Sequence, residues 1–167
     1  MQKKSTRRGS FKVAFGTGAA LALAWLVLKV SNRSSTDALA SQSIDPATDY
    51  ESALARFAQV QALEEAKETL NPVCCSKLLT HGYKTERVII LMHGMTNCPQ
   101  QFVEFAPILY EQGYNVLIPR MPHNGLADTD TDDLRYLKAA ELRDSSNAMV
   151  DIARGLGDHI TLSLIHI

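Results

Sequence analysis

The feature that most constrains the fold is a pair of short apolar runs separated by a helical segment. Arg87–Met92 and Tyr114–Pro119 are nearly continuous runs of apolar residues. Runs of this length are typical of parallel strands covered on both faces. Residues 99–112 predict a helix, because Pro99 suits a first turn and Gly113 suits the position after a helix. The order strand, helix, strand within about 30 residues predicts a right-handed βαβ unit.

Further helices and a third strand flank this unit in the sequence. Residues 49–70 predict a helix with Asp49 as its cap, and Asn71-Pro72 ends it. Residues 131–142 and 144–156 predict two more helices, and a third strand begins at His159. This alternation indicates an α/β fold in which parallel strands have flanking helices.

The composition fits one globular domain and excludes a strongly basic nucleic-acid-binding protein. The chain has 167 residues, of which 46% are hydrophobic and 21% are charged, and its net charge is −1. This length permits a proper core. Because the charge is balanced, no global basic field exists to hold nucleic acid, and we expect no nucleic-acid partner.

The first thirty residues depart from this average. Five cations and no acidic residue precede an apolar stretch, Val13–Leu28. This order predicts a signal-anchor helix that enters the membrane through residues 13–30, with the rest of the chain facing the periplasm or the cell exterior. A cleavable signal ending near Ala38-Leu39-Ala40 and a buried core helix are the alternatives. Residues 31–48 are rich in Ser, Ala, Asp and Thr and predict a flexible tether.

The loop after the first apolar run carries the residues that point most directly to chemistry. His93-Gly94-Met95-Thr96 follows the strand and precedes the predicted helix of residues 99–112. A hydrolase that forms a tetrahedral oxyanion needs backbone N–H donors aimed at it, and Gly allows a turn sharp enough to present one. The position of this loop therefore favours an oxyanion-binding role.

From residue 71 to residue 161 the chain resembles the α/β-hydrolase superfamily, in particular bacterial esterases and monoacylglycerol-lipase-like enzymes. The resemblance rests on Val88–Phe102, on Gly113–Arg120 and on Pro122-His123-Asn124-Gly125, which is similar to the Pro-Gly-His-Gly loop of many members. It implies a serine esterase or lipase that acts on a small-molecule ester or a lipid, with no cofactor and no metal.

The resemblance also implies roles for the residues of the loop. Gly94 and Met95 would form the oxyanion loop, with the Met95 N–H as a donor. The side chains of Met95 and Thr96 would border the bound acyl group. His93 would be structural. The alternative for His93 is a general base, but the superfamily places that base near its C-terminus.

The nucleophile of such an enzyme is absent from the sequence. The third strand should lead into Gly-x-Ser-x-Gly, whereas the chain continues Leu162-Ser163-Leu164-Ile165-His166-Ile167. These six residues resemble a translated transposon-end sequencing adapter. We therefore expect native sequence to end at Thr161, residues 49–161 to be the N-terminal part of a hydrolase domain, and the chain alone to be inactive. A dyad of Ser163 and His166 is the alternative.

Three cysteines and an acidic loop are the remaining candidate sites. In an exported domain, a disulfide from Cys74 or Cys75 to Cys98 would join the segment before the first strand to the oxyanion loop. Buried free thiols are the alternative, and the spacing does not suit a metal site. The acidic loop lacks the spacing of a calcium-binding EF-hand, which favours a solvated loop and helix cap; its residues are Asp128, Asp130, Asp132 and Asp133.

Three functional hypotheses follow from these observations. The first is a carboxylic-ester hydrolase with a serine nucleophile, of which this chain holds an incomplete part. The second is a non-catalytic, membrane-tethered α/β module that displays a binding surface. The third, a Rossmann-type or flavodoxin-like domain, is disfavoured because residues 93–99 lack a Gly-x-Gly-x-x-Gly phosphate-binding loop.

Overall fold

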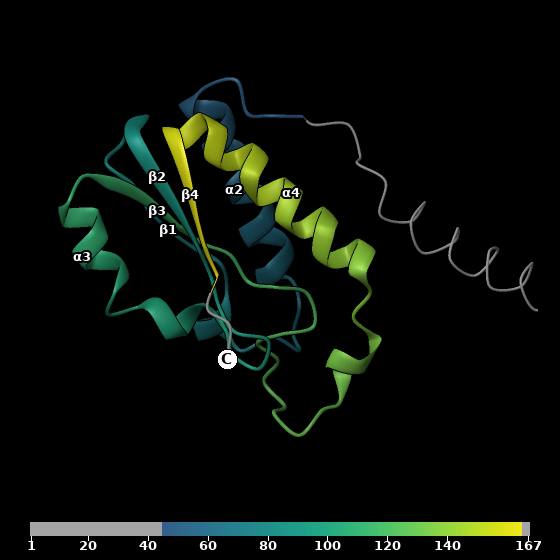
Figure 1. Ribbon diagram of the computed structural model, residues 1–167. Helices are drawn as coiled ribbons and strands as arrows, with labels where there is room; N and C mark the ends of the chain where they lie inside the picture. Colours follow the sequence, from purple (N-terminus) through teal and green to yellow (C-terminus); the bar gives the residue numbers. More distant parts are fainter. Residues whose placement is uncertain (1–44, 165–167) are drawn as a thin grey trace, which may run out of the picture. The chain divides into compact units, whose positions relative to one another are not determined.

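The computed structural model describes residues 45–164, which form a mixed α/β fold around a mostly parallel sheet (Figure 1). The four strands of this part of the chain lie in the order β1-β3-β2-β4. Strand β2 pairs in parallel with β3 on one side and with β4 on the other, and β1 pairs antiparallel with β3. The strands are β1 (Lys77–Leu79), β2 (Thr85–Met92), β3 (Tyr114–Ile118) and β4 (Gly157–Leu164).

Helices cover both faces of the sheet. Helix α3 (Ala106–Glu111) lies on one face, and helices α2 (Tyr50–Glu65) and α4 (Ala139–Leu156) lie together on the other (Figure 1). Because successive side chains of a strand point to opposite faces, β2 contributes to two cores at once. Val88 and Ile90 pack toward α2 and α4, and Ile89 and Leu91 pack toward α3. The prediction of central strands buried on both faces is confirmed.

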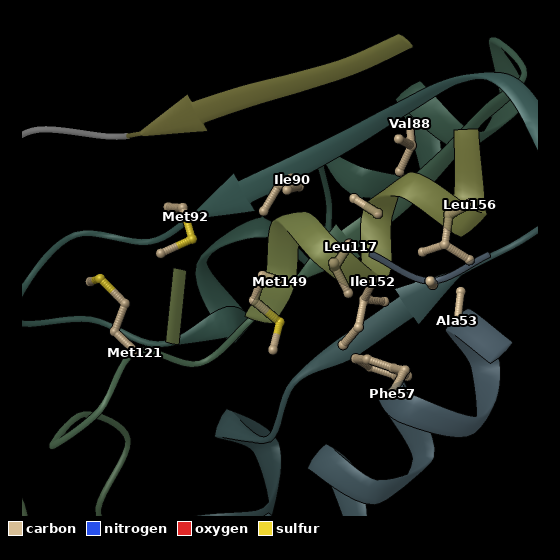
Figure 2. Close-up of a cluster of buried hydrophobic side chains, with 12 residues drawn as sticks. Ala53, Phe57, Val88, Ile90, Met92, Leu117, Met121, Met149, Ile152 and Leu156 are labelled. Carbon is tan, nitrogen blue, oxygen red and sulfur yellow. The ribbon is translucent and has the colours of Figure 1, made fainter. Parts of the chain in front are cut away.

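Figure 2 shows the core between the sheet and the two longer helices. Phe57 of α2 and Ile152 and Leu156 of α4 meet Leu117 of β3, and all four side chains are at most 4% exposed. Three methionines gather at one end of this layer, toward the carboxyl ends of the strands. They are Met92, Met121 and Met149.

The predicted helix of residues 49–70 is shorter in the structure. Asp49 does cap it, because its carboxylate accepts a hydrogen bond from the Ser52 N–H at 2.8 Å. The helix ends at Glu65, however, and Leu70 forms an isolated antiparallel bridge with Leu126. Pairing with a distant loop therefore replaces the last helical turn.

The predicted helix of residues 99–112 is also divided. A 3₁₀-helix covers Pro99–Phe102, and α3 begins only at Ala106. Phe105 is 47% exposed, whereas Phe102 is buried. The break changes the angular position of Phe105, so that it no longer lies on the same face as Phe102.

The two helices predicted between residues 131 and 156 have different boundaries. A short 3₁₀-helix covers Asp133–Tyr136, and a single helix, α4, follows without interruption. Its first turn is capped by Glu141, whose carboxylate accepts from the Lys138 N–H at 2.9 Å. Asp144, expected to begin a helix, lies inside α4 and pairs with Arg143.

Strand β1 and the turn that follows it have no strong local pattern in the sequence and were not among the predicted elements. Residues 80–84 form this turn at the amino ends of the parallel strands, where Gly82 has a φ of +85° and open space around it. Strand β4 runs through Leu164, beyond the expected end of native sequence at Thr161. Residues 45–48 were expected in the tether, but Ala47 is buried and its N–H donates to the Asp151 carbonyl at 2.9 Å.

The predicted membrane segment, residues 13–30, and most of the tether lie outside the described residues. Between residues 45 and 164 no helix combines the length and the apolar character needed to cross a bilayer.

Candidate oxyanion site

The loop of residues 93–98 leaves the carboxyl end of β2 at the centre of the sheet. The Asn97 N–H donates to the Gly94 carbonyl at 3.0 Å and closes a tight turn with Met95 and Thr96 at its two central positions. Gly94 is buried, whereas Met95 is 46% exposed. The turn therefore exposes Met95 and Thr96 to solvent, whereas Gly94 at its start is buried.

Hydrogen bonding distinguishes the backbone donors of this turn. The Gly94 N–H donates to Gln101 Oε1 at 3.2 Å, and the Asn97 N–H is used in the turn itself. Within the described part of the chain, the Met95 and Thr96 N–H groups donate no hydrogen bond. These two donors are available to an external acceptor such as a carbonyl oxygen or an oxyanion.

His93 fixes the base of the loop. Its side chain is fully buried, and its Nε2 accepts a hydrogen bond from the Met121 N–H at 3.0 Å. Since a backbone N–H can only donate, Nδ1 carries the ring proton and donates it to the Gly94 carbonyl at 2.8 Å. Burial lowers the pKa of His93 from its usual 6.5, so the ring is neutral near pH 7. Both nitrogens are engaged, which supports the structural role and not the general base.

A network behind the loop holds the segment that carries Met121. Glu64 of α2 accepts hydrogen bonds from the Ser76 N–H at 2.6 Å and the Ser76 hydroxyl at 2.9 Å, and it pairs with Arg120 at 3.2 Å. The Arg120 guanidinium also donates to the carbonyls of Met121 and Asn124, at 3.2 and 3.1 Å. Through Met121 this network reaches His93, and no local sequence pattern predicts it.

A disulfide ties the far end of the loop to the segment before β1. Of the two pairings open in the sequence, the structure contains Cys74–Cys98, with 5.2 Å between the Cα atoms. Cys75 is free and half-buried, and burial raises the pKa of its thiol. Gly125 packs directly on the bridge, since a Cβ placed there would lie 2.7 Å from the Cys74 Cβ.

His123 occupies the position at which the resembled Pro-Gly-His-Gly loop has its first Gly. Its φ is +61°, a left-handed conformation that disfavours residues with a Cβ. The side chain compensates by contacting two carboxylates, Asp133 at 2.7 Å and Glu141 at 3.6 Å. The left-handed backbone at His123 is a conformation that glycine adopts without strain. His123 lies beside the loop and not at the Met95 N–H.

The acidic loop does not gather its carboxylates in one place. Asp133 contacts His123, Asp132 pairs with Arg135, and Asp128 accepts from the Asp130 N–H at 3.0 Å. Residues 45–164 contain no group of three His, Cys, Asp or Glu side chains arranged to hold a metal ion. Asp132 lies at the N-cap position of the 3₁₀-helix Asp133–Tyr136, but its side chain makes no capping hydrogen bond.

Two depressions of different character flank the turn. An apolar cavity of about 190 Å³ lies on the Met95 side, between α4 and the carboxyl ends of β2 and β4. A polar depression of about 420 Å³ lies on the Thr96 side and is bordered by Asn97 and His123. The turn thus lies between an apolar cavity and a depression lined mostly by residues with polar side chains.

The sheet topology explains why depressions form at this edge. From β2 the chain passes over one face to β3, and from β3 it passes over the other face to β4. In open α/β sheets a crevice forms outside the carboxyl ends of strands at such a reversal, and ligands bind there. Met92 and Leu164, which pair with each other, mark this point.

The alternative dyad is not assembled within the described residues. Ser163 lies in β4 and pairs with Leu91. His166 lies outside the described residues.

Comparisons with known proteins bear on the fold only. No protein-family model matches the chain, and no curated protein matches it. One solved structure similar to this fold comes from work describing two metagenome-derived lipolytic enzymes, LipS and LipT. The identity is 19% and the TM-score 0.46, over 57% of this chain. The match spans 37% of that protein's length, well under two thirds of it.

Proposed function

We propose that this domain supplies the oxyanion loop of a carboxylic-ester hydrolase that uses a serine nucleophile. The observation that carries the proposal is the turn at the carboxyl end of β2, which leaves the Met95 N–H unbonded within the described residues. His93 and the disulfide hold the two ends of the loop. A donor fixed in advance stabilises developing negative charge without reorganising during the reaction.

The nucleophile and its base belong to sequence beyond Thr161 in this proposal. Strand β4 ends beside β2, so a serine in a sharp turn after β4 would lie next to the Met95 loop. The chain of residues 1–167 is then inactive by itself, and the substrate of the complete enzyme is a small-molecule ester or a lipid.

The first test is to sequence the source gene beyond the codon for Thr161. The proposal expects a Gly-x-Ser-x-Gly motif shortly after β4, followed by an acid and a His. A gene that encodes Leu162–Ile167 and then a stop would refute the catalytic proposal and favour the non-catalytic binding module.

The second test removes one backbone donor from the complete enzyme. Met95 occupies the first central position of its turn, the position that Pro favours in the common turn types. Met95→Pro deletes the N–H, and we expect kcat for p-nitrophenyl butyrate to fall by about a hundredfold or more. Met95→Ala keeps the N–H and is the matched control. Equal kcat values for the two variants, with equal unfolding midpoints in urea, would exclude an oxyanion role.

We further propose that the domain faces the periplasm or the cell exterior, anchored through residues 13–30. The disulfide supports this location, because such bonds persist in oxidising compartments. A reporter enzyme active only outside the cytoplasm, fused after residue 48, tests the orientation. Activity of a reporter that works only inside the cytoplasm would contradict it.

A further inference from the structure

Residues 128–137 form an exposed strap that leads from the polar depression to helix α4. None of these ten residues is buried. The 3₁₀-helix inside the strap, Asp133–Tyr136, contributes no buried side chain, and Tyr136 is 54% exposed. A segment that buries so few side chains opens locally at a low cost in free energy. The contacts that attach the strap to the domain therefore decide how often it opens.

One polar contact attaches the strap to the rest of the domain. Among the described residues, Asp133 makes the only hydrogen bond or ion pair that joins residues 128–137 to another part of the chain. Its Oδ2 lies 2.7 Å from Nδ1 of His123. The other ring nitrogen, Nε2, lies 3.6 Å from Oε2 of Glu141, in the first turn of α4. The His123 ring thus lies between a carboxylate of the strap and a carboxylate of the helix.

This arrangement suits only the charged form of the ring. An ionised carboxylate can accept a hydrogen bond but cannot donate one, so each ring nitrogen that faces one needs a proton. The imidazolium carries both protons, whereas the neutral ring carries one. On losing a proton, His123 keeps a single ordinary hydrogen bond and turns a lone pair toward the other carboxylate. The attachment of the strap is therefore stronger when the ring is charged.

The other charged groups near His123 do not replace these two partners. Glu64 and Lys67 of α2 line the same depression as His123 on one side, and Asp128 lines the polar depression on the other. Arg120 precedes His123 in the chain, and its charge is offset by the ion pair with Glu64 at 3.2 Å. Within the described residues, none of these four groups forms an ion pair with the ring. The two carboxylates that contact the ring therefore dominate its response to pH.

The backbone of His123 and the position of the strap give this contact a consequence. The φ of His123 is +61°, a conformation that a residue with a Cβ adopts at a cost, and the ring contacts help to hold it. The strap also borders the polar depression on the Thr96 side of the loop of residues 93–98. A strap that moves away exposes this side of the loop to solvent. The strap residues that line the depression are Asp128, Thr129, Thr131 and Leu134.

We propose that His123 is a pH-sensitive latch, whose charged ring holds the strap of residues 128–137 against the domain and whose neutral ring loosens it. Histidine changes its charge between about pH 5 and pH 8. The strap is then closed at acidic pH, and the polar depression is more accessible at pH 8. This inference does not rest on the proposed hydrolase function, because it concerns access to the depression whatever reaction takes place beside it.

The test measures how fast trypsin cuts the strap of the complete protein after Arg135, whose side chain is 61% exposed. The wild type is compared with His123→Asn at pH 5.5 and at pH 8. Asn accepts a left-handed backbone but does not titrate. Both proteins meet the same protease at each pH, so the ratio of their cleavage rates cancels the pH dependence of trypsin. We expect the rate of the variant relative to the wild type to fall about fivefold from pH 5.5 to pH 8.

Two further variants complete the test. His159→Asn changes an exposed histidine of β4, and its cleavage rate should equal that of the wild type at both pH values. Asp133→Asn keeps His123 but removes the carboxylate of the strap, and it should be cut fast at both pH values. A rate ratio for His123→Asn that is the same at pH 5.5 and pH 8 would overturn the proposal. If His123→Asn is unfolded by its urea midpoint, a wild-type pH dependence of cleavage in Asp133→Asn would overturn it instead.

Discussion

The buried pair of Glu64 and Arg120 gives the sharpest test of what holds the loop of residues 93–98 in place. Their side chains are 6% and 9% exposed, and they join α2 to the segment after β3. We consider Arg120→Met in the complete protein. This change replaces the aliphatic stem of Arg120 with another unbranched apolar chain and removes the charged guanidinium. It leaves the Glu64 carboxylate with Ser76 as its hydrogen-bond partner.

The structure sets the size of the expected effect. Arg120 donates three side-chain hydrogen bonds, to Glu64 at 3.2 Å, Met121 at 3.2 Å and Asn124 at 3.1 Å. At about 1 kcal/mol each, their loss costs about 3 kcal/mol. Breaking a buried ion pair from one side costs about 3–5 kcal/mol, because a charge stays buried without its partner. We expect a loss of this size in the free energy of unfolding.

Urea unfolding followed by circular dichroism measures the loss. The control is Lys84→Met, which breaks the Lys84–Asp158 pair at 2.9 Å, whose side chains are 40% and 65% exposed. Exposed pairs contribute under about 1 kcal/mol, since water screens them. The double variant Glu64→Gln with Arg120→Met should recover part of the loss, because Gln keeps an acceptor for Ser76. If Arg120→Met costs no more than Lys84→Met, the network does not support the loop as argued.

Three further predictions concern the loop and its surroundings. Cys98→Ser should lower the free energy of unfolding by about 3 kcal/mol, because the bridge spans 24 residues, while Cys75→Ser should change it little; equal losses would contradict the pairing. Gly125→Ala should lower the free energy of unfolding more than Gly82→Ala does. Both glycines have a left-handed backbone, which costs an alanine about 1–2 kcal/mol, but only a Cβ at residue 125 would also collide with the disulfide. Equal urea midpoints for the two variants would contradict this packing. Acidification from about pH 7 to about pH 5 should destabilise the protein. Burial lowers the pKa of His93 in the folded state, so as the pH falls below 6.5 the unfolded chain binds a proton at this residue before the folded chain does. His93→Gln should make the urea midpoint depend less on pH in this range, and an unaltered slope would refute the prediction.

The elements that the sequence predicts well are those with a strong local pattern. The apolar runs of β2 and β3 suit one environment, a sheet covered on both faces. The predicted ends of both strands lie within two residues of those in the structure. The position of the loop after β2 can also be predicted, because the loop begins where the apolar run of the strand ends.

The remaining features depend on contacts between residues distant in sequence. Glu64 and Arg120 are 56 residues apart, and each alone has the pattern of a surface charge. The Met121 N–H is 28 residues from His93, and no local pattern predicts that a backbone group would bind the ring. Helix α2 ends early because Leu70 pairs with Leu126, which a helical periodicity cannot reveal. Strand β1 has only three residues, too few to show an alternation.

The turn of residues 80–84 is a suitable place to insert a label or a tag, because of where the sheet topology places it. It lies at the amino ends of the parallel strands, whereas the loop of residues 93–98 lies at their carboxyl ends. The length of β2, eight residues, separates the two by about 25 Å. Gly82 has open space around it, and exposed turns of this kind accept inserted sequence. A fluorescent label or purification tag inserted at Gly82 would therefore report on the protein without entering the site.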